Sequence, residues 1–123
     1  MSRFKNRAFA VRLGYALRGF AAAAASERSL RVQLIAVPVV FAALWWLRAE
    51  ALWWALVAAG CAAVLSTELM NTALEHLCDV LHPEDSEAIG LIKDCAAAAV
   101  LIACLGALAV AVALGLHLFY QFP

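Results

Sequence analysis

Three long apolar runs dominate the chain after its first thirty residues, and charged residues mark the ends of the first two and the start of the third. The runs cover residues 32–47, residues 51–67 and residue 95 to the C-terminus. Seventeen helical residues rise about 25 Å, which approaches the hydrocarbon thickness of a bilayer when flanking residues extend the helix. The pattern predicts three transmembrane helices, contained in helices over residues 31–48, 51–78 and 87–120.

Tryptophans surround the short connection between the first two runs. They precede and follow the segment Arg48-Ala49-Glu50, at positions Trp45, Trp46, Trp53 and Trp54. Tryptophan is enriched where a membrane meets water, so these side chains are typical of an aromatic belt at one interface. Pro38 lies inside the first run, where a membrane helix tolerates proline and bends at it.

The segment before the first run has a different, amphipathic pattern. Its large apolar residues recur at helical spacing on one narrow face; they are Phe9, Leu13, Leu17 and Phe20. Every Arg and Lys of the segment lies outside that face. This pattern predicts an N-terminal helix over residues 2–25 that lies in the membrane interface. A cleaved targeting segment is the alternative, but Arg12 and Arg18 interrupt the apolar stretch that such a segment needs.

Composition agrees with one small membrane domain over residues 1–123, because 67% of the residues are hydrophobic and the net charge is zero. The charges are unevenly placed. Residues 1–31 hold seven Arg or Lys and one acid, whereas residues 68–94 hold seven acids and one base. The basic segment should be cytoplasmic, and the predicted topology places the acidic segment on the same side.

Directly after the second apolar run, polar side chains recur along one face of the predicted helix, and we call this row the polar stripe. At about 100° per residue, four of them fall within roughly 80° of one helix face; they are Glu68, Asn71, Glu75 and Asp79. Ionisable groups near a bilayer are expensive and mark a functional site by default. Pro83 should end this helix, and a new helix should start between Asp85 and Glu87, which places Lys93 and Asp94 near the stripe.

Carboxylates without a set of thiolates or imidazoles favour a hard cation such as Mg²⁺, which is commonly shared with substrate phosphates. A nearby lysine suits phosphate oxygens, and a further carboxylate can accept a proton from an alcohol. These groups suit phosphoryl transfer, although the sequence lacks a Walker A loop. A proton-coupled transporter, or purely structural polar contacts between helices, would also place carboxylates here.

The remaining titratable residues show no ligand pattern. Cysteine occurs four times without the spacing of a metal site, at Cys61, Cys78, Cys95 and Cys104. We interpret these residues as small packing residues. His117 is predicted to be an interfacial or packed residue, and His76 points about 100° away from Glu75, so neither is given a role.

The polar stripe, written Glu68-x-x-Asn71-Thr72-Ala73-x-Glu75-x-x-x-Asp79, resembles the signature of the small prokaryotic diacylglycerol kinases, a family that includes undecaprenol kinases. The later segment Lys93-Asp94-x-Ala96-Ala97-Ala98-x-Val100 and the early segment Gly14-Tyr15-Ala16-Leu17-Arg18-Gly19 carry the same resemblance. It implies an all-α homotrimer in the bacterial inner membrane, with active sites shared between subunits. It also implies transfer of the ATP γ-phosphate to a lipid hydroxyl.

The resemblance further implies a role for each matching residue. Glu68 would be the base at the lipid hydroxyl, and Glu27 and Glu75 would hold Mg²⁺. Nucleotide contacts would come from Tyr15, Glu27, Asn71, Glu75, Asp79, Glu84, Asp85, Ser86, Lys93 and Asp94. The chain departs from the family pattern at Ala8, where an arginine is expected, at Gln33, where some relatives have an acid, and at Asp85-Ser86, where some have an aromatic residue and a histidine. The segment 71–76 leans toward the undecaprenol kinases.

Overall fold

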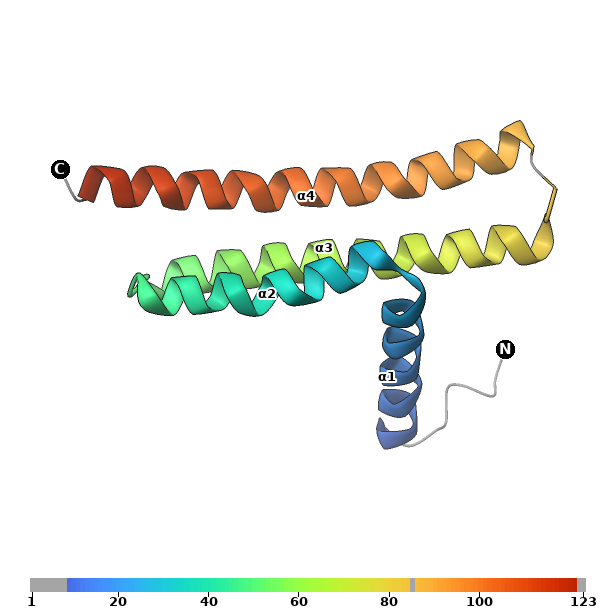
Figure 1. The fold of residues 1–123 in the computed structure, drawn as a ribbon, viewed down its shortest axis with the longest axis horizontal. Coiled ribbons are helices and arrows are strands. Elements are labelled where there is room, and N and C mark those ends of the chain that lie inside the picture. The colour runs from blue at the N-terminus through green and yellow to red at the C-terminus, as the bar shows by residue number, and fades with distance from the viewer. Residues whose placement is uncertain (1–8, 85, 122–123) are drawn as a thin grey trace.

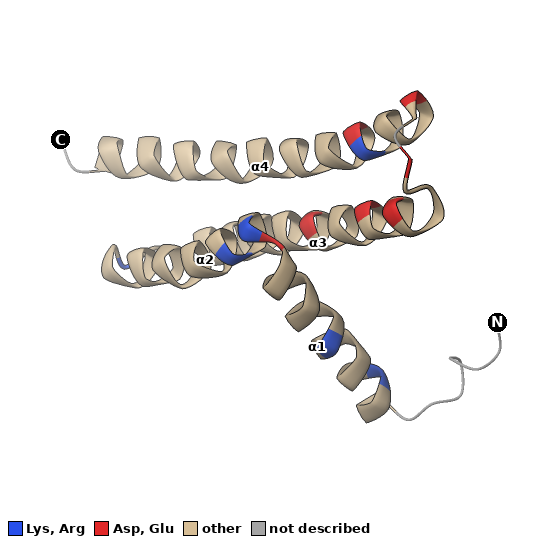
Figure 2. Ribbon diagram, turned by 45° about the vertical axis from the view of Figure 1, so that its right-hand side comes forward, with Lys and Arg blue, Asp and Glu red and all other residues tan. Residues whose placement is uncertain are grey.

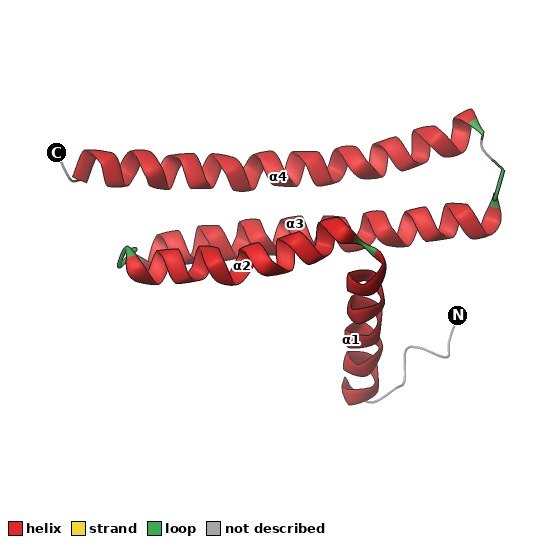
Figure 3. Cartoon of the chain, viewed as in Figure 1, coloured by secondary structure: helices red, strands yellow, loops and turns green. Residues whose placement is uncertain are grey.

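The described part of the chain is entirely helical (Figures 1 and 3). The computed structural model describes residues 9–84 and 86–121, which form α1 (Phe9–Ser26), α2 (Arg28–Trp46), α3 (Ala51–Leu81) and α4 (Glu87–Gln121). No strand occurs within these residues. The all-α prediction is therefore confirmed for this part of the chain, while the predicted helical residues 2–8 lie outside it.

The helices form a three-helix layer with one helix set across it. Figure 1 shows α2, α3 and α4 running along the long axis of the molecule, while α1 projects sideways from the start of α2. The α2–α3 connection and the end of α4 lie at one end, and the α3–α4 loop lies at the other. This arrangement suits an interfacial α1 beside three spanning helices.

Three helices are long and apolar enough to cross a membrane. Their mean hydropathies are 1.6 for α2, 1.5 for α3 and 2.7 for α4, over 19, 31 and 35 residues. The prediction of three candidate spans is confirmed by length and composition. At about 1.5 Å per residue, α3 is about 46 Å long, so part of it must extend beyond a hydrocarbon core of about 30 Å.

The helix boundaries differ from the predicted ones by up to three residues. Helix α2 begins at Arg28 because one extended residue, Glu27, with φ −100° and ψ 120°, separates it from α1. It ends at Trp46, since Arg48 takes a left-handed φ of 51° in the turn. Helix α3 continues to Leu81, where Pro83 prevents further propagation, rather than stopping at Cys78. Helices α1 and α4 each end one residue later than predicted.

Hydrogen bonds join α1 to the beginning of α2 at a tight corner. The guanidinium nitrogen Nη1 of Arg31 donates to the carbonyl oxygens of Ala24 and Ala25, at 3.1 Å and 2.9 Å. The backbone N–H of Glu27 donates to the Ala23 carbonyl at 2.8 Å. These donors satisfy carbonyls that the end of α1 would otherwise leave without partners. The side chain of Arg31 thereby links the direction of α1 to that of α2.

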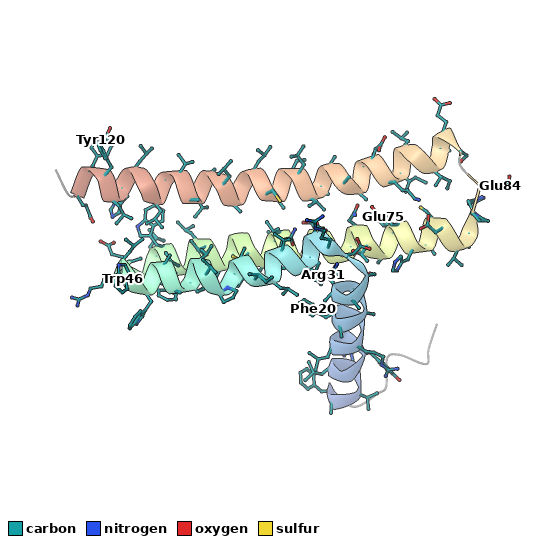
Figure 4. The ribbon with its side chains drawn as sticks, viewed as in Figure 1. Phe20, Arg31, Trp46, Glu75, Glu84 and Tyr120 are labelled. Carbon is teal, nitrogen blue, oxygen red and sulfur yellow. The ribbon has the colours of Figure 1, made fainter. Side chains whose placement is uncertain are left out.

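Aromatic side chains gather at the opposite end of the layer, near the α2–α3 connection. The indole N–H of Trp54 donates to the Ala49 carbonyl at 3.2 Å, and the ring of Trp54 lies 5.6 Å from that of Phe41. Trp53 packs 5.3 Å from His117 of α4, which confirms His117 as a packed residue. Figure 4 places Trp46 and Tyr120 at this same end, as an aromatic belt requires.

The core within one chain is small. Among the described residues, only Leu30 and Leu44 are large side chains that are fully buried, and Ala96 is the only buried residue of α4. Large apolar side chains along α4 are exposed instead, including Leu101, Ile102 and Leu116. Such a surface needs lipid or another protein chain against it. The four cysteines are free thiols; Cys78 is buried and Cys61 half-buried, whereas Cys95 and Cys104 are exposed on the single chain.

Candidate functional site

Opposite charges meet at one end of the three-helix layer. Figure 2 shows acids along the second half of α3 and at the start of α4, and basic residues on α1 and at the start of α2. Because α1 turns into α2 beside α3, the acidic and basic segments share this end of the molecule. The exposed α2–α3 connection, with Arg48 and Glu50, lies at the far end.

Glu68 is the most buried acid of the polar stripe on α3. Its side chain is only 6% exposed, and the hydroxyl Oγ of Ser29 in α2 donates a hydrogen bond to its Oε1. The hydroxyl of Thr72, also buried, donates instead to the Glu68 backbone carbonyl at 3.0 Å. A buried carboxylate needs such a donor, and Ser29 supplies it from a different helix.

Asn71 and Glu75 form the next contact along the stripe. The amide Nδ2 of Asn71 donates to Glu75 Oε1 at 2.9 Å, and both side chains are half-buried. The amide oxygen Oδ1 of Asn71 is buried without a hydrogen-bond partner among the described residues. An unpaired buried oxygen beside a carboxylate is an acceptor that a cation or its bound water would satisfy.

Asp79 and Lys93 join α3 to α4 where the stripe reaches the loop. Lys93 Nζ lies 2.6 Å from Asp79 Oδ1, and the two side chains are 37% and 62% exposed. The carboxylate of Asp79 raises the pKa of Lys93, mainly through this hydrogen bond, so the ammonium stays charged. The structure therefore brings Lys93 to the stripe, as the sequence predicts.

At the α3–α4 loop and the start of α4, one of the predicted site residues caps the helix and two others are exposed to solvent. Ser86 Oγ accepts a hydrogen bond from the backbone N–H of Ile89 at 3.3 Å and so caps α4. Glu84 is exposed, and Figure 4 shows it in the loop, away from Glu75. Asp94 is exposed and lines a shallow pocket with Glu87. Asp85 lies outside the described residues. Because Glu84 and Asp94 are accessible to water, this region suits a water-soluble ligand.

Glu27 is the single residue that separates α1 from α2. It occupies the N-cap position of α2 without a capping hydrogen bond from its side chain, and it is half-buried. Within the described residues, no three acids, histidines or cysteines lie close enough to form a metal site. The oxygen atoms of Glu27, Glu75 and Asn71 are nevertheless of the kind that Mg²⁺ prefers when phosphates complete its coordination.

A pocket of about 520 Å³ lies between α1 and α3, on the face of α3 next to the stripe. Its lining includes Tyr15 and Phe20 from α1, and Thr72 and His76 from α3. The guanidinium carbon of Arg18 lies 5.3 Å from the centre of the Tyr15 ring. His76, which the sequence analysis gave no role, thus faces the same pocket as the predicted nucleoside contact.

A third pocket, of about 220 Å³, lies among α2, α3 and α4 toward the middle of the layer. Its lining is apolar except for Gln33, and it includes Cys61 and Cys104. The oxygen Oε1 of Gln33 is buried and finds no partner among the described residues. Gln33 lies one helical turn beyond Ser29 on α2, so polar groups continue from Glu68 into the apolar layer.

Sequence reasoning missed Ser29 and the capping role of Arg31. Neither belongs to the quoted motifs. Ser29 bonds a residue 39 positions later, on α3, and Arg31 bonds carbonyls at the end of the preceding helix. The available signal was a hydroxyl residue in the first turn of a helix, two positions after Glu27, which by itself indicates only a helix start. Which helix faces that hydroxyl is a tertiary property.

Comparison with known proteins identifies the family of the chain. The model of the family described as prokaryotic diacylglycerol kinase matches residues 14–114. The proteins named diacylglycerol kinase from Escherichia coli (strain K12) and Shigella flexneri are each 33% identical over 90 residues, covering 73% of this chain and 74% of the relative. That of Synechocystis sp. (strain ATCC 27184 / PCC 6803 / Kazusa) is 36% identical over 97 residues, which cover 78% of this chain and 55% of the relative. Since the match extends over most of its length, the chain belongs to the prokaryotic diacylglycerol kinase family.

Proposed function

We propose that this protein is a lipid kinase that transfers the γ-phosphate of MgATP to the hydroxyl of diacylglycerol, giving phosphatidic acid. One observation carries the proposal: the stripe on α3 begins at buried Glu68, next to the apolar run, and ends at the exposed pair Asp79 and Lys93. The rise of a helix separates Glu68 from Asp79 by about 16 Å. One row of polar groups therefore connects a buried carboxylate beside the apolar run to a pair that is open to water.

Glu68 is proposed to act as the general base. It would accept the proton of the lipid hydroxyl while the hydroxyl oxygen forms a bond to the γ-phosphorus and the bond from that phosphorus to ADP breaks. A base must lie within hydrogen-bond reach of the proton that it removes. The donation by Ser29 to Glu68 supports this role, because the carboxylate accepts a hydrogen bond from a hydroxyl group in this structure.

Glu27 and Glu75 are proposed to hold Mg²⁺ together with the ATP phosphates. The bound ion would neutralise charge on the phosphoryl group during transfer. Asn71 orients Glu75 through its amide, and its unpaired oxygen suits a water of the ion. The helix rise places Glu68 and Glu75 about 10 Å apart, which leaves space for the acceptor hydroxyl and the transferred group between them.

The nucleotide is proposed to bind at the exposed end of the stripe. Lys93 and Asp94 would lie at its phosphates, and Tyr15 would lie against the nucleoside. Asp79 would hold Lys93 in place, and the loop residues Glu84, Asp85 and Ser86 would surround the site. A charged ammonium held by one carboxylate can interact with phosphate oxygens, and the openness of this region supports access from water.

The identity of the acceptor lipid is the most specific part of the proposed function. The relatives carry the name diacylglycerol kinase, which favours diacylglycerol. The segment Asn71-Thr72-Ala73-Leu74-Glu75-His76 resembles the undecaprenol kinases instead. The chemistry at Glu68 is the same for both alcohols, so undecaprenol is the alternative acceptor, and it would yield undecaprenyl phosphate.

We also propose a homotrimer in the bacterial inner membrane, with a cytoplasmic N-terminus. The exposed apolar side chains of α4 support burial against neighbouring chains as well as lipid. Basic residues on α1 and at the start of α2 lie at the same end as the acidic stripe, and this end would face the cytoplasmic ATP.

The decisive experiment is a phosphoryl-transfer assay. Purified protein in mixed micelles is given labelled ATP and Mg²⁺ with either diacylglycerol or undecaprenol, and labelled lipid is measured. Glu68→Gln should lower turnover by at least about 100-fold, because proton transfer to the base is lost. ATP binding should remain nearly intact in that variant. Glu50→Gln is the matched control, since Glu50 lies at the far end of the molecule.

Normal turnover of Glu68→Gln would contradict the assignment of the base. Absence of transfer to either lipid, together with substrate flux into vesicles without ATP consumption, would support the alternative of a proton-coupled transporter. A structural role alone would be indicated if Glu68 and Asn71 could both be replaced by apolar residues without a change in lipid phosphorylation.

A further inference from the structure

We infer that Ser29 is a positioning residue for Glu68: its hydroxyl holds one carboxylate oxygen so that the other can receive the proton of the lipid hydroxyl. The inference rests on the proposed function, because it needs Glu68 to be the base. Ser29 lies outside the family motifs quoted above. It belongs to the first turn of α2, two residues after Glu27.

The contact joins helices that are distant in sequence. Ser29 Oγ donates to Glu68 Oε1 across 39 residues, from α2 to α3. Within residues 9–84 and 86–121, Ser29 is the only side chain that hydrogen-bonds the Glu68 carboxylate. Thr72 is buried beside it, but its hydroxyl donates to a backbone carbonyl. The orientation of this carboxylate therefore depends on one hydroxyl.

The backbone that carries Ser29 is itself firmly placed. The next residue, Leu30, is fully buried, and Arg31 binds two carbonyls at the end of α1. A hydroxyl on such a backbone can direct a partner side chain, because its own position varies little. Glutamate has three side-chain torsions, so without a partner it would sample several orientations.

Burial makes this orientation matter for the chemistry. Glu68 is 6% exposed whereas Ser29 is exposed, so their hydrogen bond lies at the edge of the buried region. A positioned base works best when reacting atoms are already aligned. Oε1 is occupied by Ser29, and this leaves Oε2 to accept the proton from the lipid.

A different reading of the same contact makes a different kinetic prediction. If Ser29 merely occupied the place of the lipid hydroxyl, its removal would relieve competition and lower the KM for the lipid. If Ser29 positions the base, its removal should lower kcat and leave the KM values for lipid and MgATP unchanged. We propose the second behaviour, since a carboxylate can accept hydrogen bonds on both oxygens.

The test compares substitutions in the full chain, in mixed micelles with diacylglycerol and MgATP. Ser29→Ala should lower kcat by about ten-fold, the typical effect of losing one hydrogen bond to a charged group. Ser29→Thr keeps the hydroxyl and should restore most of the turnover. Ser26→Ala is the matched control, because Ser26 lies at the same corner but donates to the Ala23 carbonyl at 3.2 Å.

Three results would overturn the inference while leaving the base assignment intact, provided that Glu68→Gln is inactive. The first is an unchanged kcat for Ser29→Ala, and the second is a change confined to the KM for the lipid. The third is an equal loss in Ser29→Ala and Ser29→Thr, which would show that the hydroxyl is not the active feature. Full activity of Glu68→Gln would instead remove the proposed function itself.

Discussion

At the scale of single residues, the site consists of pairs of polar side chains joined by hydrogen bonds. Ser29 donates to Glu68, and Asn71 donates to Glu75 within α3. Lys93 holds Asp79 across the α3–α4 loop. The first two pairs lie closer to the apolar run, where an unpaired carboxylate is expensive, and the third is open to water. Each acid of the stripe is thus both stabilised and oriented.

The metal role of Glu75 makes a testable prediction at this scale. Glu75→Gln should raise the Mg²⁺ concentration required for half-maximal lipid phosphorylation by about ten-fold, or eliminate activity, because a neutral amide binds the ion less well. A titration of Mg²⁺ at fixed ATP measures this effect. Glu50→Gln is the control, since Glu50 is an exposed acid at the far end of the molecule. An unchanged magnesium dependence in Glu75→Gln would exclude the metal role.

At the scale of helices, the main-chain pattern was largely predictable because membrane helices are defined by long apolar runs. The three runs predicted α2, α3 and α4, and the boundary errors have local causes. Helix α2 starts early because a single extended residue, Glu27, suffices for the corner. Helix α3 continues past Cys78 because acids such as Asp79 are compatible with a helix, whereas Pro83 is not.

The corner between α1 and α2 should depend on Arg31. Arg31→Ala removes the two hydrogen bonds to the carbonyls of Ala24 and Ala25, an interaction worth about 0.3–1 kcal/mol at a helix C-terminus. The direction of α1 should then vary more widely. Spin labels on α1 and α3, at Arg12 and Met70, would report a broader distance distribution in a background without native cysteines.

Arg28→Ala serves as the matched control, because Arg28 is exposed on the same turn and its side chain makes no hydrogen bond among the described residues. Its distance distribution should equal that of the parent protein. If Arg31→Ala also left the distribution unchanged, the capping contact would have no influence on the direction of α1.

At the scale of the whole molecule, one chain buries too little to account for its own stability. Only Leu30 and Leu44 are large, fully buried side chains in the described part, and α4 buries Ala96 alone. Lipid covers part of such a surface, but the proposed homotrimer would bury more of it through close packing of small residues. The proposed assembly would account for both the apolar exposure and the open site.

Subunit mixing tests whether the active sites are shared. Glu68→Gln and Lys93→Met chains should each be inactive as pure assemblies. Co-assembled from a denatured mixture, they should regain a fraction of parental turnover, because some sites would then combine an intact Glu68 with an intact Lys93 from another chain. Cross-linking should give a limit of three copies of the 13.2-kDa chain.

The control is a mixture of Glu68→Gln chains with Glu68→Gln,Lys93→Met chains, which contains no intact Glu68 and should stay inactive. If the first mixture also stayed inactive while trimers formed, each site would be built within a single chain.

Taken alone, the sequence determined the helices, the stripe on α3 and the family, because these depend on hydrophobic runs, on a fixed 100° step and on motif spacing. Lys93 was placed near Asp79 correctly, since a short loop forces α4 back along α3. Only the tertiary structure decided that Ser29 faces Glu68 and that Arg31 caps α1. Those contacts join different helices, and the rotation of one helix against another depends on packing that no local pattern records.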